Sequence, residues 1–416
     1  MSDARAVEPG RDRPLVVIVT ETFEPEVGGG ETQARTLADE LIARGYRVRL
    51  ITRRSRPELS KREVQGELEI VRVPFAGRGR WKKWALMGSA FPALMRGVQG
   101  AHVVLVSGFR FLGVPAVVAS RTRGVPCVLK ADNRGELSGD YFRAGLERFG
   151  LRPNSVPVRI FVGIRNAMLR RAQAFIAISE EMVREYGAHG IPVAAIRRIP
   201  NAVDARRFCP ATPDERDTLR RRLGLPDEPL VLFTGRLVTH KGVRELLRAW
   251  ERIHSTARGH LVFVGEGGAD MHACEEELRA FVRDRKLESR VRFTGAVPNV
   301  AEYLRAADVF AFPSLNDALP LSLLEAMACG LPVIATHVGA IGDFLEDDVN
   351  GVVVTPGDDQ SLERALRRLI AGGPDNARLG AAARATVLER FSHVAVTDAW
   401  IRLFSEVQPR GPGQPT

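Results

Sequence analysis

The stretch from Ser314 to Pro332, S-L-N-D-A-L-P-L-S-L-L-E-A-M-A-C-G-L-P, contains the signals of a loop, a helix and the start of a strand. Pro320 suits the first position of a helix, where its missing N–H costs nothing. Apolar residues at helical spacing are predicted to face inward, namely Leu321, Leu324 and Ala328. The closing Gly-Leu-Pro predicts the end of the helix, and P-V-I-A-T predicts a buried strand after it.

Three polar features of this stretch are predicted to converge on one spot. Asp317 lies in the loop, and Glu325 lies one helical turn beyond Ser322 on the same side of the helix. Free N–H groups at the helix start, at Leu321 and Ser322, suit phosphate, and a carboxylate suits paired hydroxyls such as those of a ribose. The stretch therefore predicts a nucleotide-sugar pocket, although two acids on a surface helix can equally be solvated.

A second motif, Gly235–Gly242, has the sequence G-R-L-V-T-H-K-G and joins a predicted strand, Leu230–Thr234, to a predicted helix, Val243–Ile253. Such a junction brings Arg236 and Lys241 to one place, where two cations would neutralise a diphosphate. Each charge-assisted hydrogen bond contributes about 1.5–3 kcal/mol. The same residues could form a solvated basic loop. A diphosphate site is the favoured interpretation because the acidic motif follows further along the chain.

The chain begins with a strand, a glycine-rich bend, a helix and a second strand, which is the start of a doubly wound sheet. The bend is Gly28–Gly30, and it is not the G-x-G-x-x-G of dinucleotide-binding proteins. Short apolar runs predict strands at Leu15–Thr20, Tyr46–Thr52, Ala101–Val106, Pro126–Lys130, Ala174–Ser179, Leu230–Thr234, His260–Val264, Val291–Thr294, Val309–Phe312, Val333–Thr336 and Val352–Thr355. The predicted fold class is α/β, with two doubly wound, Rossmann-like domains.

Length and composition favour the same organisation. The chain has 416 residues, more than one core usually holds, and 45% of them are hydrophobic, enough for two cores. No apolar run approaches the roughly 18–20 residues of a membrane span, and the polar N-terminus lacks the apolar core of a signal peptide. Four scattered cysteines favour cytoplasmic thiols over a zinc site. The net charge of +10 suits an anionic partner or an arginine-rich, solvated surface.

Two of these motifs resemble those of retaining GT-B glycosyltransferases of the family-4 kind, the glycosyl transferases group 1. The spacing from Asp317 to Glu325 is similar to the family's E-x7-E, with Asp and Ala318 where the family usually has Glu and Gly. The second motif matches the family's G-R-x4-K-G. The resemblance covers nearly the whole chain and implies two domains facing across a cleft. Their expected bounds are 1–206 for the acceptor-binding domain, 207–388 for the donor-binding domain, and 389–416 for a helix crossing back to the first domain and a tail.

The resemblance also implies roles for individual residues in sugar transfer from a UDP- or GDP-sugar, with no cofactor and no metal. Arg236 and Lys241 would stabilise the departing diphosphate, Glu325 would hold the ribose, and Asp317 would position the donor sugar. Asp132 stands near the place of a family histidine, as a replacement or only as the cap of a turn. Further donor contacts are expected at Gly29, Gly30, Gly235, Gly265, Glu266, Val297, Leu321 and Ser322. A non-catalytic sugar-nucleotide sensor or partner subunit, or a GT-B epimerase, would share these features.

The segment 78–96 mixes basic side chains with tryptophan. It begins with Arg78 and continues from residue 79 as G-R-W-K-K-W-A-L-M-G-S-A-F-P-A-L-M-R. Such mixtures suit a membrane interface, and a lipid-linked acceptor would make peripheral attachment to the cytoplasmic face of a membrane useful. A surface helix that packs its aromatic residues on the domain core has the same pattern. No motif of a nucleic-acid-binding fold is present, so nucleic acid is not an expected partner.

Overall fold

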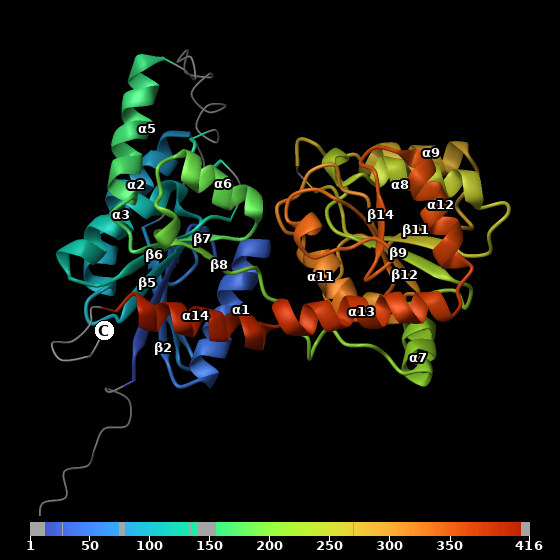
Figure 1. Ribbon diagram of the computed structural model, residues 1–416, viewed down its shortest axis with the longest axis horizontal. Coiled ribbons are helices and arrows are strands. Elements are labelled where there is room, and N and C mark those ends of the chain that lie inside the picture. Colours follow the sequence, from blue (N-terminus) through green and yellow to red (C-terminus); the bar gives the residue numbers. More distant parts are fainter. Residues whose placement is uncertain are drawn as a thin grey trace, which may run out of the picture. The chain divides into compact units, whose positions relative to one another are not determined.

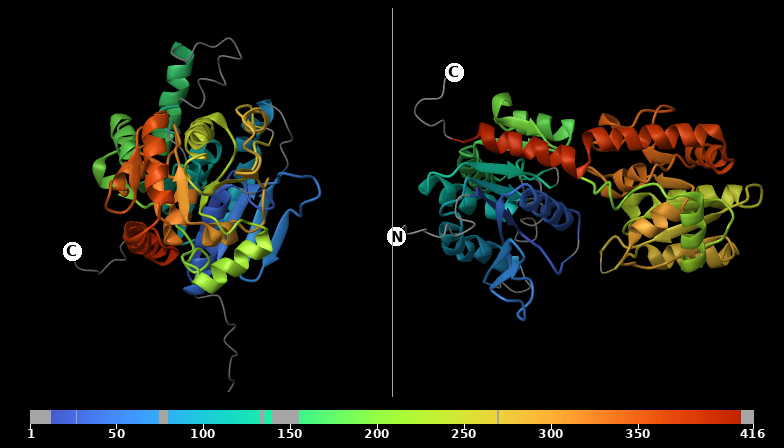
Figure 2. Two further views of the ribbon diagram at one scale, coloured as in Figure 1. Left: turned by 90° about the vertical axis from the view of Figure 1, so that its right-hand side faces the viewer. Right: turned by 90° about the horizontal axis from the view of Figure 1, so that it is seen from below.

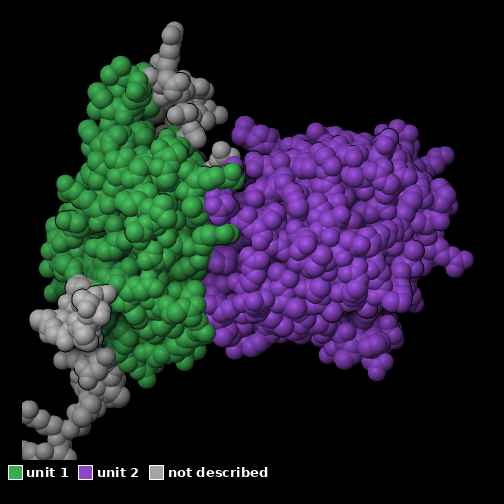
Figure 3. All heavy atoms as spheres, viewed as in Figure 1, with its two compact units in different colours: residues 1–177, 182–199, 397–416 green, residues 178–181, 200–396 purple. Residues whose placement is uncertain are grey.

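The computed structural model describes residues 13–26, 28–74, 80–132, 135–139, 155–268 and 270–408; at 80–85 and 87 it describes the backbone alone. The chain divides into two compact units (Figure 3). Unit 1 comprises Met1–Ala177, Met182–Ile199 and Thr397–Thr416. Unit 2 comprises Ile178–Glu181 and Pro200–Val396.

Unit 1 is built on an eight-stranded sheet. Its strands are β1 (Leu15–Thr20), β2 (Arg47–Arg53), β3 (Arg62–Gln65), β4 (Leu68–Val73), β5 (Val103–Ser107), β6 (Cys127–Lys130), β7 (Ala174–Ala177) and β8 (Ile196–Arg198). They lie in the order β3-β4-β2-β1-β5-β6-β7-β8 and run parallel, except that β3 is antiparallel to β4. The winding reverses between β1 and β5, and ligands of doubly wound sheets bind at such a switch point.

Helices cover both faces of this sheet (Figure 1, Figure 2). They are α1 (Gly29–Ala43), α2 (Arg80–Gly97), α3 (Phe109–Thr122), α5 (Val156–Leu169), α6 (Glu180–Ala188), the short η1 (Val193–Ala195) and the later part of α14 (His393–Glu406). On one face α3 packs between α2 and α5, and α1 packs against β1 and β2. No described helix is both long and apolar enough to span a membrane.

Unit 2 is built on a six-stranded, wholly parallel sheet. Its strands are β9 (Leu230–Thr234), β10 (His260–Val264), β11 (Val291–Phe293), β12 (Val309–Phe312), β13 (Val333–Thr336) and β14 (Val352–Val354). The order is β11-β10-β9-β12-β13-β14, so the switch point lies between β9 and β12. Its helices are α7 (Pro213–Leu223), η2 (Thr239–Lys241), α8 (Val243–Ile253), α9 (Glu275–Asp284), α10 (Val300–Ala306), α11 (Leu321–Ala328), η3 (Ile341–Asp343), α12 (Asp359–Ile370) and α13 (Pro374–Arg390).

The predicted α/β class with two Rossmann-like domains is confirmed. The unit boundary falls after Ile199, whereas the sequence placed it after residue 206. The segment between these positions pairs with the segment before α14, because the Val203 N–H donates to Phe391 O at 2.8 Å and Val203 O accepts from the His393 N–H at 2.9 Å. The antiparallel pair of β3 and β4 was not predicted.

Candidate nucleotide-sugar site

An ion pair between Lys241 and Asp317 lies at the switch point of the unit 2 sheet. Lys241 ends η2 in the loop after β9, and Asp317 belongs to the loop after β12, so two neighbouring strands deliver the two side chains. Lys241 Nζ contacts Asp317 Oδ2, and both side chains are mostly buried. The same Nζ lies 5.4 Å from the centre of the buried Phe312 ring. The structure thus brings one residue of the basic motif to one residue of the acidic motif.

The loop that carries Asp317 is held closely from two sides. Its carboxylate Oδ1 accepts a 2.9 Å hydrogen bond from the Ala318 N–H. A Cβ on Gly242 would lie 1.8 Å from Pro313 O, and a Cβ on Gly339 would lie 1.9 Å from Asp317 O. Both glycines have positive φ, 69° and 57° respectively. Only glycine fits at these two positions, and the result is a fixed course for the loop.

Arg236 has a different partner from Lys241. Its guanidinium pairs with Asp270, in the loop after β10, and its side chain is 62% exposed. The predicted convergence of the two cations is therefore only partial, because an acid outside both motifs holds one of them. Both still act on His240, since burial lowers the pKa of His240 and the charges of Lys241 and Arg236 lower it further.

Helix α11 begins at Leu321, one residue later than predicted, because Pro320 is extended and precedes the first turn; no side chain caps the N-terminus. Leu321 and Ser322 are partly exposed in its first turn, whereas Leu323 and Leu324 are buried. Leu321, predicted to face inward, is only half-buried, whereas Leu324 and Ala328 are buried as predicted. The uncapped N–H groups of the first turn remain suited to an anion.

Glu325 lies one turn into α11 and has a strongly perturbed carboxyl group. Burial raises its pKa to about 7, and the Arg207 charge acts in the opposite direction. Its carboxyl oxygens form no hydrogen bond or ion pair with the described residues. Arg207 was not predicted as a site residue. The only sequence signal was the pair of arginines in V-D-A-R-R-F, before α7.

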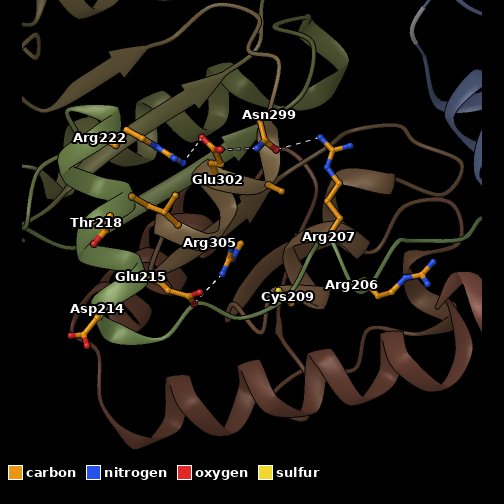
Figure 4. Close-up of a pocket in the computed structure, with 12 residues that line it drawn as sticks. Arg206, Arg207, Cys209, Asp214, Glu215, Thr218, Arg222, Asn299, Glu302 and Arg305 are labelled. Atoms are coloured by element: carbon orange, nitrogen blue, oxygen red, sulfur yellow. Dashed lines mark hydrogen bonds and ion pairs between the residues drawn. The ribbon is translucent and has the colours of Figure 1, made fainter.

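Arg207 also lines a pocket of about 670 Å³ in unit 2 (Figure 4). Its guanidinium donates to Asn299 Oδ1 at 3.4 Å, and Asn299 donates to Glu302 at 2.8 Å. Asn299 follows Val297 in the loop after β11, so this chain of contacts connects the Glu325 neighbourhood to that loop. Val297 itself is half-buried.

The remaining predicted donor contacts of unit 2 lie at the carboxyl ends of β9 and β10. The Gly235 N–H donates to Val264 O at 3.0 Å, and the Gly265 N–H donates to Gly295 O at 2.9 Å. The backbone oxygen of Glu266 accepts a hydrogen bond from the Leu237 N–H at 3.1 Å, and the Glu266 side chain is exposed. These residues share the sheet edge with Lys241 and Asp317, because all strands of unit 2 run parallel.

In unit 1, Asp132 lies at the carboxyl edge of the sheet, just after β6. Its Oδ1 accepts a 2.9 Å hydrogen bond from Ser107 Oγ and lies 3.5 Å from Lys130 Nζ. Gly30 approaches it, since a Cβ there would lie 3.4 Å from Asp132 Oδ2. Gly29 precedes Gly30 in the first turn of α1. Lys130 was not predicted, although it is almost fully buried beside the carboxylate.

Two further acids fix the loop after β6. Glu136 Oε1 accepts from the Asp132 N–H at 3.1 Å and pairs with Arg110 at 3.3 Å. Glu185, from α6, accepts hydrogen bonds from the backbone of residues 135 and 138. The position of the Asp132 carboxylate is therefore set by the sheet, a hydroxyl, an ammonium group and a tethered loop.

Metal ligands do not gather anywhere in the described part of the chain, where no three His, Cys, Asp or Glu side chains could hold an ion. Asp348, one of two adjacent acids that could suggest a metal, pairs instead with Arg368 and Arg378. The predicted membrane segment 78–96 lies partly outside the described residues, including the side chains of Trp81 and Trp84.

Comparisons with known proteins identify the family of this chain. Residues 228–372 match the model "Glycosyl transferases group 1", and residues 28–202 match "Glycosyl transferase 4-like domain". A D-inositol 3-phosphate glycosyltransferase of Xylanimonas cellulosilytica is 29% identical, covering 98% of this chain and 100% of that protein.

Two solved structures share the fold. Sucrose-phosphate synthase from Thermosynechococcus elongatus has a TM-score of 0.75 at 23% identity, covering 95% of this chain and 99% of that one. Anabaena HepE in complex with UDP has a TM-score of 0.72 at 19% identity, covering 94% and 99%. This chain therefore belongs to the group 1 glycosyltransferases of the GT4 family and has the GT-B fold.

Proposed function

We propose that this protein transfers a sugar from a UDP- or GDP-sugar to an acceptor hydroxyl, with retention of anomeric configuration and without a metal ion. The observation that carries the proposal is the Lys241–Asp317 pair at the unit 2 switch point, next in the chain to the uncapped N-terminus of α11. Doubly wound sheets bind their ligands at that place, and a cation beside free N–H groups suits a diphosphate.

In the proposed reaction the bond between the anomeric carbon and the diphosphate breaks, and a bond from that carbon to the acceptor oxygen forms. Negative charge grows on the departing diphosphate, where Lys241, Arg236 and the N–H groups of Leu321 and Ser322 would stabilise it. Lys241 would exchange Asp317 for phosphate, which leaves Asp317 to position the donor sugar. No enzyme nucleophile is assigned.

The nucleoside end of the donor would lie between Glu325 and the loop of Val297, with Gly235, Gly265 and Glu266 along the same sheet edge. A half-buried carboxylate without a protein partner suits the two hydroxyls of a ribose. The raised pKa of Glu325 fits this role, because a bound diol would replace the water that burial removes.

Unit 1 would bind the acceptor and contribute Gly29, Gly30 and Asp132 toward the donor sugar. A lipid-linked acceptor, at the cytoplasmic face of a membrane that segment 78–96 contacts, fits the net charge of +10. Four free cysteines fit a cytoplasmic location.

The test compares Lys241→Ala with Arg244→Ala, a nearby surface arginine that pairs with Glu277. Thermal shifts with UDP-, GDP- and ADP-sugars would first identify the donor, since a ligand at 100 times its Kd adds about 2.7 kcal/mol to stability. Donor turnover, measured as released nucleotide diphosphate, should fall about 10²–10³-fold in Lys241→Ala and stay unchanged in Arg244→Ala. Turnover should also be the same with and without EDTA. Normal turnover by Lys241→Ala would refute the mechanism, and a wild type that binds donor without ever hydrolysing it would be a sensor.

A further inference from the structure

Helix α5 presents an apolar face to solvent. Val156, Ile160 and Ile164 are 66%, 57% and 60% exposed and lie on one line of the helix, four residues apart. Phe161, next to that line, is also exposed. A surface helix usually turns its apolar residues inward and its polar residues outward, so α5 has an unusual distribution.

The inner side of α5 shows that the helix is not simply misoriented. Its buried residues include Arg165 and Asn166. Asn166 donates to Leu137 O at 2.9 Å and accepts from Arg165 at 3.0 Å. On the same side, Leu169 packs against α3, where a Cβ on Gly113 would lie 3.0 Å from it. The polar residues that face inward have partners, and the aliphatic residues that face outward are left for another surface.

The charges carried by this helix and its C-terminal end have one sign. The sequence from 155 to 171 contains no Asp or Glu, and Arg159, Arg170 and Arg171 are exposed. A second copy of this chain would therefore oppose arginine to arginine across a symmetric contact on α5. An anionic surface that also accepts aliphatic side chains complements the face better.

The N-terminus of α5 lies close to the edge of the unit 1 sheet where an acceptor is expected. The helix follows β6 and precedes the parallel strand β7, so its N-terminus lies at the carboxyl edge of the unit 1 sheet, the edge that carries Asp132. In Figure 1 that end of α5 extends beyond α2 and α3. A surface docked on Val156 and Ile160 would thus adjoin the side of unit 1 where an acceptor is expected.

From these observations we infer that the exposed face of α5 docks unit 1 on an anionic lipid bilayer. The aliphatic residues enter the boundary between headgroups and acyl chains, and Arg159, Arg170 and Arg171 lie among the phosphates. The purpose of this docking rests on the proposed function, in which the acceptor is lipid-linked. The docking itself needs neither donor nor acceptor, so it can fail or succeed independently of sugar transfer.

The experiment is co-sedimentation of the full chain with vesicles of about three parts phosphatidylcholine to one part phosphatidylglycerol. The double variant Ile160→Ser/Ile164→Ser should lower the partition coefficient at least about tenfold. A matched control is Val64→Ser/Val193→Ser, which removes two exposed valines elsewhere in unit 1 and should bind as the wild type does. Arg159→Gln should weaken binding about fivefold, and only to the anionic vesicles.

Equal binding by the wild type and the Ile160→Ser/Ile164→Ser variant would overturn the inference and would point to segment 78–96 instead. Absence of wild-type binding would overturn it as well. A wild-type dimer that this variant converts to a monomer, seen by sedimentation velocity, would assign the face to self-association. Unchanged donor hydrolysis by the variant would show that the proposed function stands apart from the outcome.

Discussion

In unit 1 the lysine and aspartate of an ion pair, Lys130 and Asp132, are neighbours at the end of a single strand. In unit 2 the corresponding pair, Lys241 and Asp317, joins the loops of two neighbouring strands and is separated by 76 residues. Both pairs lie at the carboxyl edge of a parallel sheet. The first is a local arrangement that fixes one carboxylate, and the second ties two loops together.

This difference bears on what each pair can do. Lys130 is fixed by the sheet, and Ser107 shares the Asp132 carboxylate with it, so the pair is suited to hold that group in one place. Lys241 extends from a loop, and its aspartate keeps a backbone hydrogen bond even when the lysine leaves. A cation of the second kind can change partner when a phosphate arrives, whereas a cation of the first kind cannot.

Within unit 1, the largest expected effect concerns the fixed carboxylate. Asp132→Asn keeps its size but loses its charge, and turnover of donor to acceptor should fall about 10²-fold if the group orients the reacting sugar. The measurement is steady-state transfer with the donor that the thermal shifts identify. Asp39→Asn, at the surface of α1 where Asp39 pairs with Arg35, is the control and should retain activity. Full activity in Asp132→Asn would show that Asp132 only caps a turn and does not orient the reacting sugar.

Double-mutant cycles would compare the two pairs directly. The coupling energy in unfolding should be about 2 kcal/mol for Lys241 with Asp317, and about 1 kcal/mol or less for the longer Lys130–Asp132 contact, whose carboxylate Ser107 also binds. A saturating nucleoside diphosphate should abolish the first coupling, because phosphate replaces Asp317, and should leave the second unchanged. Urea unfolding of the single and double alanine variants gives these values. Coupling that survives the ligand would contradict the exchange of partners.

The pKa of Glu325 predicts a pH-dependent donor affinity. A ribose needs the ionised carboxylate, so the nucleotide sugar, whose diphosphate does not titrate in this range, should bind about tenfold more weakly at pH 6 than at pH 8, given a pKa of about 7. In Glu325→Gln the affinity should be weaker but independent of pH over that range. Isothermal titration at several pH values measures both.

The same group predicts the sign of a change in stability. Its folded pKa of about 7 lies above its ordinary value of 4.5, so the folded chain holds the proton more tightly. The free energy of unfolding should therefore decline as the pH rises from about 4.5 to about 7, and Glu325→Gln should remove that part of the decline. An identical pH profile in the variant would show that the carboxyl group is solvated.

The smallest effect should come from the outer cation. Arg236→Ala should lower turnover only about three- to tenfold, because an exposed charge contributes less than a buried one. Lys241→Ala in the same assay provides the scale. Equal losses of turnover in the two variants would mean that Arg236 and Lys241 stabilise the diphosphate equally, as their shared motif predicted.

The strands of unit 2 could be predicted because each is a short apolar run that ends at polar or glycine residues. Their parallel direction was also expected, and it places the residues after each strand at one edge. That reasoning located Lys241 and Asp317 correctly relative to the sheet, without showing that they touch. The partner of Arg236 could not be found in this way, since Asp270 lies in a loop whose course has no periodic pattern.

Lys130 and Arg207 were missed for related reasons. A lysine at the end of an apolar run usually marks an exposed strand end, but β6 lies between β5 and β7 and its last residue is buried. The Arg207 charge lowers the pKa of Glu325 because the linker before α7 passes close to α11. The sequence of a linker has no periodic pattern that predicts its path. The missing information was the burial of the strand end for Lys130 and the course of the linker for Arg207.

Gly242 and Gly339 have a practical consequence for engineering. Neither position has space for one more carbon atom, so a library that aims at a new sugar preference should leave both codons untouched. Diversity is better directed to Leu315 and Asn316, which are exposed in the loop between those two constraints.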